Sequence, residues 1–415
     1  MQSVRALLAC AAMVGLLAGC SEAADDAPPT WEPSPSVGIG GDGPGAQASP
    51  IVPLPSGGPG IGGPGGNPAP GGRTPTPSPS GGKHDDPNVV ATHLTAPVGL
   101  AMMPDGSALV GERTTGRIVR VQPRAGQPVP TVTTLRHLDT SGDGGLLDLA
   151  LSPTFNEDEL VYAYVTTRTD NRVVDFTLTG PTTTGPVTPV FTGIPKGRTG
   201  NTGRITFGWD GDLYIGTGDA GRPHLAREPD SLAGKVLRVD PIGDPAPDNP
   251  DPSSPVYSSG HQVVDGLCVL PQTRWLVDVE PGAGRNSGEV NLLGRGGDYG
   301  WPRARAGAIA PISRLPANTG TPGGCAFLGG RLWVTSLAGQ QLLYAAVRPG
   351  IMAPSTGSFA AVLKNRYGRL RTVVAASDGA LWLTTSNRDG HGRPVPDDER
   401  VIRYVPTVGG SRSRL

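Results

Sequence analysis

Trp209-Asp210-Gly211-Asp212-Leu213-Tyr214-Ile215 is the stretch that decides the fold, because it is one copy of a unit that recurs along the chain. Close copies are Pro104-Asp105-Gly106-Ser107-Ala108-Leu109-Val110 and Ser377-Asp378-Gly379-Ala380-Leu381-Trp382-Leu383, and weaker copies span residues 153–162, 271–277 and 328–334. The pairs Asp-Gly and Gly-Gly supply the positive φ that a tight turn needs. A strand rich in β-branched, aromatic or other apolar residues follows the turn. The repeated unit is therefore a turn and a strand.

The spacing of these copies predicts how they assemble. Their key apolar residues recur roughly every 50 to 60 residues, the period expected of propeller blades; they are Leu109, Leu160, Leu213, Trp275, Leu332 and Leu381. A second strand signal, with alternating polar and apolar residues, follows each copy at residues 116–121, 171–174, 234–239, 288–292, 340–344 and 400–404. An all-β, six-bladed β-propeller accounts for six such pairs. A β-sandwich is the alternative, which even spacing over about 320 residues disfavours.

The N-terminus has the pattern of a targeting segment. Arg5 precedes an apolar run at residues 6–17, which is too short to span a bilayer comfortably. Leu17-Ala18-Gly19-Cys20 then resembles a bacterial lipobox. The resemblance implies a lipoprotein signal peptide at residues 1–19 and a diacylglycerol on Cys20, which would anchor the chain at the extracytoplasmic face of the cell membrane. A plain secretory signal is the alternative.

Composition divides the rest of the chain. Residues 20–87 are rich in Pro, Gly and Ser and poor in apolar residues, which predicts a disordered linker. Residues 88–406 have the composition of one folded domain, in which residues 89–94 and 401–405 are positioned to close the ring, and residues 407–415 form a C-terminal tail. The formal net charge of −1 argues against nucleic acid as a partner.

Two of the four cysteines belong to the folded domain. Cys10 leaves with the signal and Cys20 is the lipid site, which leaves Cys268 and Cys325. Aligned on the turns, these two occupy equivalent positions in the first strands of neighbouring blades. In an oxidising compartment they could form a disulfide; two buried free thiols are the alternative.

Motifs spread over the repeats resemble those of a known enzyme family. They are Gly144-Gly145-Leu146-Leu147, Gly203-Arg204-Ile205-Thr206-Phe207-Gly208, Thr217-Gly218-Asp219, Leu232-Ala233-Gly234-Lys235-Val236-Leu237-Arg238, Pro255-Val256-Tyr257 with Gly260-His261, Glu289-Val290-Asn291-Leu292 with Gly296-Gly297-Asp298-Tyr299-Gly300-Trp301-Pro302, and Arg369-Leu370-Arg371. In these motifs, residues 88–406 resemble the quinoprotein glucose/sorbosone dehydrogenases. That resemblance implies a propeller that uses pyrroloquinoline quinone (PQQ) and calcium to oxidise aldoses or related alcohols outside the cytoplasm.

The resemblance breaks at positions that carry the chemistry. The family's general base is a histidine four residues before the arginine matched by Arg204, and this chain has Gly200 there. Glycine cannot transfer a proton. The family's Gly-His-Arg-Asn reads Gly260-His261-Gln262-Val263 here, so Gln262 and Val263 replace the arginine and asparagine that hold the quinone. The resemblance therefore implies no catalytic side chain at Gly200.

Other ligand positions are partly retained. Asp143 lies where the family carries a Gln or Glu near the quinone, although a turn role is the alternative. Arg369 and Arg371 match an Arg-x-Arg that can face the cofactor's carboxylates, and a structural salt bridge is the alternative. Backbone carbonyls of the family's Gly-Pro bind calcium, and Pro281 and Gly282 are the corresponding positions here.

Two functions remain open at this stage. One is an extracytoplasmic, PQQ-dependent oxidoreductase acting on a sugar or related alcohol. The other is a non-catalytic, membrane-anchored propeller that binds a sugar, a cell-wall component or a protein. The histidines show no metal-ligand spacing, and no hydrolase nucleophile motif occurs; the histidines considered are His93, His137, His224, His261 and His391.

Overall fold

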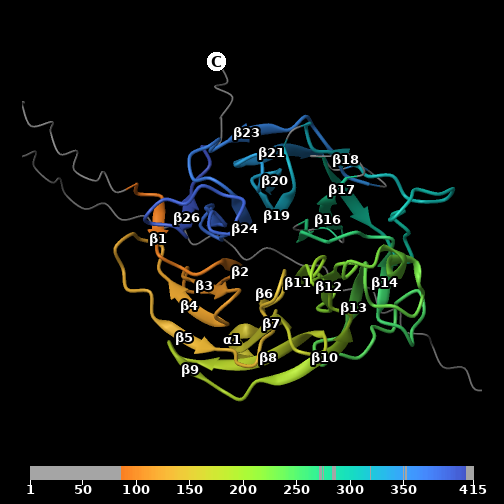
Figure 1. The fold of residues 1–415 in the computed structure, drawn as a ribbon, viewed down its shortest axis with the longest axis horizontal. Helices are drawn as coiled ribbons and strands as arrows, with labels where there is room; N and C mark the ends of the chain where they lie inside the picture. The colour runs from red at the N-terminus through yellow and green to blue at the C-terminus, as the bar shows by residue number, and fades with distance from the viewer. Residues whose placement is uncertain are drawn as a thin grey trace, which may run out of the picture. The chain divides into compact units, whose positions relative to one another are not determined.

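The computed structural model describes residues 86–407 apart from residues 271, 272, 274, 283–286, 318, 349, 351 and 352. Over this part of the chain the strands form six antiparallel sheets arranged around a central axis (Figure 1). The predicted six-bladed β-propeller is therefore confirmed. The predicted signal peptide, Cys20, and nearly all of the linker and C-terminal tail lie outside the described residues.

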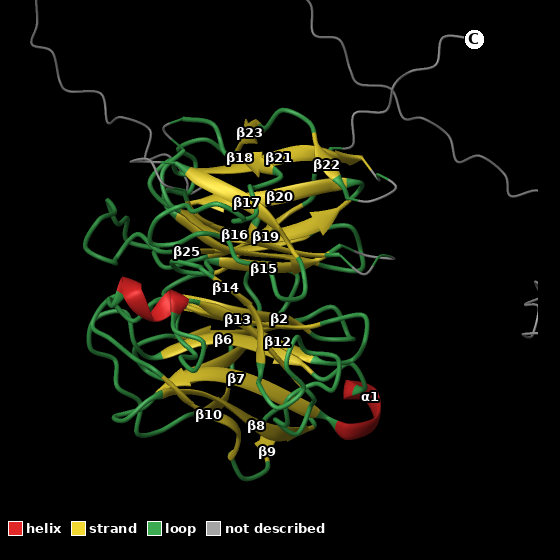
Figure 2. Cartoon of the chain, turned by 90° about the vertical axis from the view of Figure 1, so that its right-hand side faces the viewer, coloured by secondary structure: helices red, strands yellow, loops and turns green. Residues whose placement is uncertain are grey.

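The blades follow one another along the chain, and each begins with its innermost strand. Blades one to three comprise β2 (Pro97–Met102), β3 (Ala108–Glu112), β4 (Arg117–Val121) and β5 (Thr131–Thr134); β6 (Leu146–Leu151), β7 (Leu160–Thr166), β8 (Asn171–Thr179), β9 (Thr183–Thr184) and β10 (Thr188–Ile194); and β11 (Gly203–Phe207), β12 (Leu213–Thr217), β13 (Lys235–Val239) and β14 (Val256–Ser259). Blades four to six comprise β15 (Gly266–Val269), β16 (Leu276–Pro281), β17 (Gly288–Leu293) and β18 (Ser313–Arg314); β19 (Pro322–Leu328), β20 (Arg331–Ser336), β21 (Gln341–Arg348), β22 (Ser355–Thr356) and β23 (Ala360–Val362); and β24 (Leu370–Ala375), β25 (Leu381–Thr385), β26 (Val401–Tyr404) and β1 (Val89–Ala91). Two short helices, α1 (Phe155–Asp158) and the 3-10 helix η1 (Pro223–Arg227), lie in loops (Figure 2).

The N-terminal strand closes the ring. β1 is the outer strand of blade six and pairs antiparallel with β26, placing Val89 opposite Ile402. Strands from both ends of the domain thus share one sheet, as the sequence predicts. This pairing leaves the blades as a closed set of packed sheets.

The recurrent turns explain where the second strands begin. Gly106, Gly211 and Gly379 have φ values of 81°, 82° and 81°, and each lies between the first and second strands of its blade. Glycine adopts this conformation without the steric cost that a Cβ brings. Each turn therefore delivers the chain directly into a buried second strand.

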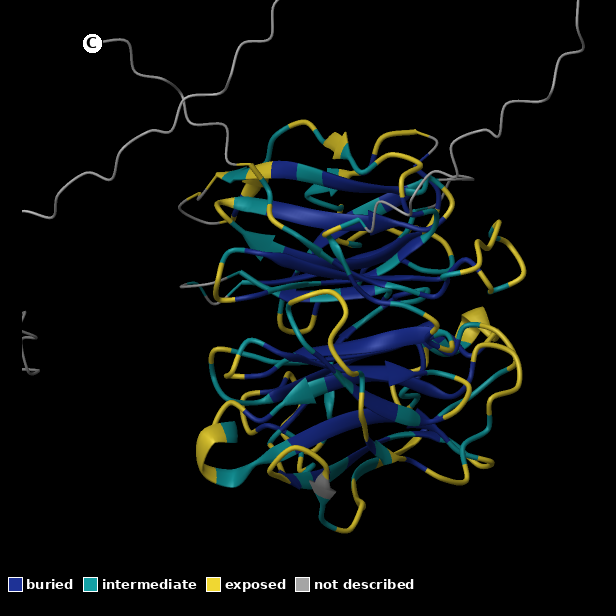
Figure 3. Cartoon of the chain, turned by 90° about the vertical axis from the view of Figure 1, so that its left-hand side faces the viewer, coloured by how far each residue is buried: buried dark blue, intermediate teal, exposed yellow. Residues whose placement is uncertain are grey.

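The core consists of apolar layers between neighbouring blades. Tyr162 and Ile215 meet in the layer between blades two and three, and Trp333 and Leu383 meet in the layer between blades five and six. Strands are largely buried whereas loops carry most of the exposed residues (Figure 3). Burial on both faces explains the long apolar runs in the strands.

A disulfide joins two of the innermost strands. Cys268 of β15 and Cys325 of β19 are bonded, with their Cα atoms 6.1 Å apart, and both are buried. This separation is typical of disulfides. The bond links blades four and five close to the axis. Within the described part of the chain, no helix is long and apolar enough to cross a membrane.

Candidate functional site

Two cavities of about 440 Å³ each lie at opposite ends of the six innermost strands. One is bordered by Val98 and Arg371, near the starts of β2 and β24, and we call it the strand-start cavity. The other is bordered by Met102 and Ala375, at the ends of the same strands, and we call it the strand-end cavity. Arg204 lines both cavities. The side chain of Arg204 therefore lies between them.

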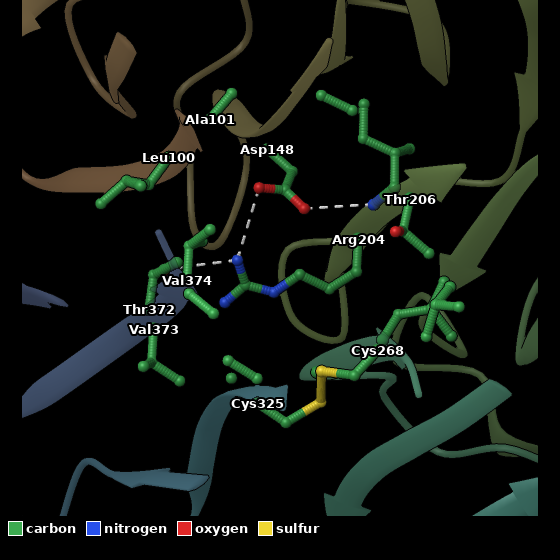
Figure 4. A pocket seen from close by; sticks show the side chains of 18 of the residues that line it. Leu100, Ala101, Asp148, Arg204, Thr206, Cys268, Cys325, Thr372, Val373 and Val374 are labelled. Atoms are coloured by element: carbon green, nitrogen blue, oxygen red, sulfur yellow. Dashed lines mark hydrogen bonds and ion pairs between the residues drawn. A yellow bond between two sulfur atoms is a disulfide. The ribbon is translucent and has the colours of Figure 1, made fainter. Parts of the chain in front are cut away.

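Arg204 ties the inner strands together. Its Nε donates to the carbonyl of Asp265 at 2.6 Å, and its terminal nitrogens donate to the Gly323 carbonyl and to Thr372 Oγ1. One terminal nitrogen also lies 3.6 Å from Asp148 Oδ1 (Figure 4). Burial raises the pKa of Asp148 to about 6, although Arg204 opposes the rise. Every guanidinium nitrogen of Arg204 thus has an acceptor within the protein.

Five positions singled out in the sequence meet at the strand-start cavity. They are Asp143, Gly200, Gln262, Val263 and Arg371. They come from loops and strand starts of different blades, so only ring closure brings them together. The cavity is therefore the place where the resemblance positions the cofactor and substrate.

Gly200 lies in a tight backbone site. Its φ is 65°, and a Cβ added there would stand 2.6 Å from Asp219 Oδ1 and 3.0 Å from the Gly221 nitrogen. The Gly200 nitrogen donates to Asp143 Oδ2 at 2.9 Å. The Asp143 side chain, which lines the cavity, therefore also holds the backbone of Gly200. Side chains other than hydrogen are disfavoured at Gly200 by both backbone strain and contact.

Gln262 and Val263 form an uncharged part of the wall. The Gln262 nitrogen donates to Glu280 Oε2 at 2.8 Å, and its carbonyl accepts from the Asp219 nitrogen at 2.9 Å. Val263 pairs with Gly218 in an isolated β-bridge. The backbone here is held firmly, while the side chains offer the cavity one amide and one apolar group.

Arg371 and Asp265 have buried atoms without partners. Among the described residues, neither Arg371 Nε nor Asp265 Oδ2 has a hydrogen-bond partner, and both side chains line the strand-start cavity. Burial lowers the pKa of Arg371 to about 10. Burial also raises the pKa of Asp265 to about 6, against the opposing charges of Arg371 and Arg204. Asp265 was not among the residues predicted from the sequence, and its only sequence signal is its position two residues after Val263.

Asp219 and Trp301 complete the polar lining. Trp301 Nε1 donates to Asp219 Oδ2 at 3.0 Å, and the Gly221 nitrogen donates to Oδ1 at 2.8 Å. Arg227 of η1 donates to the Trp301 carbonyl. The motifs that contain Asp219 and Trp301 are visible in the sequence, but no role could be assigned to either residue without the geometry. Together they present a carboxylate and an aromatic ring to the cavity.

Three other predicted positions do not line this cavity. Arg369 forms an ion pair with Asp389 at 2.8 Å, which matches the structural alternative for this arginine. Pro281 ends β16, and the Gly282 nitrogen donates to the Ser287 carbonyl. The four residues after Gly282 lie outside the described residues, so the calcium site stays a prediction.

The fold and the axial cavity define a six-bladed β-propeller with a site at its axis, and comparison with known proteins identifies its family. The chain belongs to the glucose/sorbosone dehydrogenase family, whose family model matches residues 94–323. It is similar in structure to the PQQ-bound aldose sugar dehydrogenase from Streptomyces coelicolor, with a TM-score of 0.71 and 38% identity, over 76% of this chain and 95% of that chain.

Two sugar dehydrogenases are also similar to the chain in sequence. The chain is 31% identical to quinoprotein glucose dehydrogenase B from Acinetobacter calcoaceticus in an alignment of 252 positions that covers 52% of each protein. It is 26% identical to the aldose sugar dehydrogenase YliI from Escherichia coli in an alignment of 353 positions that covers 73% of this chain and 90% of that one. The first match thus spans only about half of the relative's length.

Proposed function

We propose that the strand-start cavity binds a neutral sugar or related polyhydroxylated ligand, and that the chain does not perform the quinone-dependent oxidation expected from its family. The observation that carries the proposal is the pair of unpartnered buried atoms, Arg371 Nε and Asp265 Oδ2. Each such atom costs about 1–3 kcal/mol when it stays unpaired. A ligand that supplies both donors and acceptors recovers this cost, and hydroxyl groups do both.

The remaining lining suits a sugar as well. Asp143, Asp219 and Gln262 add further acceptors and donors, and Trp301 adds an aromatic surface. A volume of about 440 Å³ lies within the usual range of about 300–1,000 Å³ for small-ligand pockets. The cavity therefore combines a few polar groups with an aromatic wall, as ligand sites commonly do.

The same lining is a poor match for PQQ, which carries several carboxylates. Among the described residues, the aspartates Asp143, Asp219 and Asp265 line the cavity, against the arginines Arg204 and Arg371. The nitrogens of Arg204 already have protein acceptors. A polyanion would thus meet a cavity with excess negative charge and one arginine that has a free N–H. Gln262 and Val263 supply no positive charge.

Quinone-dependent oxidation is the second candidate. It is favoured by the 38% identity to the PQQ-bound aldose sugar dehydrogenase. A carboxylate, Asp219, also lies beside the position where the family's base is expected. Calcium bound near Gly282 would reduce the charge mismatch with the quinone. The two candidates differ in whether PQQ binds tightly, which can be measured directly.

Isothermal titration calorimetry tests the proposal. A panel of aldoses and polyols, and separately PQQ with calcium, is titrated into the wild-type chain, Asp265→Asn and the matched control Asp251→Asn, an exposed loop residue. We expect one or more sugars to bind with a 1:1 stoichiometry. We expect Asp265→Asn to weaken binding roughly ten- to a hundred-fold, the equivalent of about 1.5–3 kcal/mol.

The control and the cofactor titration decide between the candidates. Asp251→Asn should bind sugar like the wild type. Tight binding of PQQ, with no sugar binding in its absence, would overturn the proposal and favour the oxidoreductase. No binding of any ligand on the panel would also count against a neutral sugar.

We further propose that the chain is tethered at the extracytoplasmic face of a bacterial membrane through Cys20. The sequence Leu17-Ala18-Gly19-Cys20 supports this location. The disulfide between Cys268 and Cys325 also favours an oxidising compartment, because cytosolic thiols are usually kept reduced. The sugar ligand would then be extracellular or part of the cell envelope.

A further inference from the structure

A second polar cluster lies between blades three and four, behind the wall of the strand-start cavity. His261 lies between β14 and β15, and Asp278 and Glu280 alternate on β16 so that both face it. His261 Nδ1 lies 2.9 Å from Asp278 Oδ2 and 3.2 Å from Glu280 Oε1. One ligand atom from each of the three residues falls within 4.8 Å of the others. All three side chains are buried.

The orientation of His261 is compatible with metal binding through Nδ1. Its Nε2 lies 2.9 Å from Ser258 Oγ, and its ring stacks on Tyr299 with centroids 4.8 Å apart. A proton on Nε2 shared with Ser258 leaves the lone pair of Nδ1 directed at the two carboxylates. Metal-binding histidines commonly donate their other ring N–H to a neighbouring acceptor in this way.

Asp278 supplies an independent sign of a missing partner. Its side chain is fully buried, and among the described residues its Oδ1 has no hydrogen-bond partner. Asn291, directly opposite on β17, donates instead to Glu280 Oε1. A buried carboxylate oxygen without a donor is costly. The unpaired oxygen belongs to the same carboxylate that faces His261.

The net charge of the cluster also favours binding of a cation. Two carboxylates and one imidazolium leave an excess of one negative charge in a dry interior, which is unfavourable. A divalent ion with two carboxylates and a neutral imidazole gives a neutral cluster instead.

The donor set selects the class of ion. Calcium prefers six to eight oxygen ligands, whereas imidazole nitrogen together with carboxylate oxygen suits zinc and similar ions. Zinc binds such ligands at about 2.0–2.2 Å, so its neighbouring ligand atoms lie roughly 3–3.5 Å apart. The separations from His261 Nδ1 to the two carboxylates are close to this range.

We propose that His261, Asp278 and Glu280 bind one divalent transition-metal ion of the zinc type, at a structural site separate from the strand-start cavity. The ion would brace the cavity wall, because Glu280 Oε2 accepts from the Gln262 nitrogen and the Gln262 carbonyl accepts from the Asp219 nitrogen. The sequence spacing of the histidines did not predict this site, since its ligands come from a loop and a strand that only the blade brings together.

Metal analysis tests the proposal. Bound metal is removed from the tag-free, full-length chain with a chelator, and the chain is dialysed against zinc and then against metal-free buffer. The amount of zinc bound per chain is measured by elemental mass spectrometry. We expect about one zinc per chain in the wild type and in the control Asp251→Asn, as structural sites bind tightly. Asp278→Asn should bind zinc at least about tenfold more weakly. Chelation should lower the melting temperature of the wild type but not that of Asp278→Asn.

Cobalt gives a readout that does not depend on the variant's folding. Cobalt(II) added to the stripped wild type should produce visible absorption bands that zinc removes in a 1:1 titration. Wild-type protein with neither stoichiometric zinc nor these bands would overturn the proposal, because the cluster would then be held by protons alone. Zinc content unchanged in folded Asp278→Asn would also overturn it.

Discussion

A Cβ on Gly200 would stand 2.6 Å from Oδ1 of Asp219, and Gly200 has a φ of 65°. The family resemblance expects a histidine at this position, yet backbone and neighbour here both favour glycine. Asp219 in turn is held by Trp301 and by the Gly221 nitrogen. The strand-start cavity therefore offers a fixed carboxylate next to the place where an imidazole is expected.

Replacing Gly200 by alanine should destabilise the protein more than the same change at Gly211. Gly211 has a φ of 82° but nothing within 4 Å of an added Cβ, so Gly211→Ala reports backbone strain alone. We expect Gly211→Ala to lower the free energy of unfolding by about 1 kcal/mol. Gly200→Ala should lose roughly 1–3 kcal/mol more, because Asp219 must shift. Urea denaturation measures both, and equal losses would show that Asp219 yields freely.

Much of the fold can be predicted from the sequence because it depends on local and periodic signals. The turn glycines Gly106, Gly211 and Gly379 and the alternating strands repeat in every clear copy, so the number of blades follows from counting. The pairing of β1 with β26 also follows, since a propeller must join its first and last strands. The sequence does not predict how the side chains are arranged around the central axis.

The site could be predicted only in part, since its residues acquire meaning through contacts between blades. Position in a motif identified Gly200 and Arg371, but Arg369 carries the same motif signal and instead pairs with Asp389. Asp265 has no motif of its own, and its importance comes from burial and an unpartnered oxygen. Such properties depend on neighbours that are distant in sequence.

Asp265→Asn should change how stability depends on pH. The folded-state pKa of Asp265 is about 6, above its ordinary value of 3.8. Between these values the folded protein binds more protons at this group than the unfolded chain, so its contribution to the free energy of unfolding falls as the pH rises from about 4 to about 7. The amide cannot ionise, so the variant should gain up to about 3 kcal/mol over wild type across this range.

Chemical denaturation at several pH values measures this effect. We expect the advantage of Asp265→Asn to grow with pH while its sugar affinity is lower at every pH. A variant with a pH profile parallel to that of the wild type would show that Asp265 does not titrate in this range. Asp251→Asn serves as the exposed control.

Reduction of the bond between Cys268 and Cys325 should destabilise the propeller. The disulfide joins β15 to β19, the two inner strands beside which Arg204 binds the carbonyls of Asp265 and Gly323. We expect a loss of about 2–4 kcal/mol in the free energy of unfolding on reduction. Peptide mapping without reductant should find the two cysteines linked. Free thiols at both positions in the unreduced, denatured protein would contradict the bond.

Cys20→Ala should release the protein from the membrane or leave it unprocessed, because acyl attachment requires the thiol. Fractionation of cells that express the wild type and the variant measures this. Cys10→Ala is the matched control, because Cys10 lies within the predicted signal peptide and should not affect anchoring. Full membrane retention of Cys20→Ala would show that another feature anchors the chain.

The central claim, that the cavity binds sugar without quinone chemistry, is tested most directly by dye-coupled oxidation. The purified chain is incubated with PQQ, calcium, a sugar panel and an artificial electron acceptor, with the Streptomyces coelicolor aldose sugar dehydrogenase as positive control. We expect no dye reduction above background, since loss of a general base alone costs about 10²–10⁴ in rate. Robust PQQ-dependent turnover by the unmodified chain would contradict the claim and would mean that another group accepts the proton, with Asp219 and Asp143 the carboxylates beside Gly200.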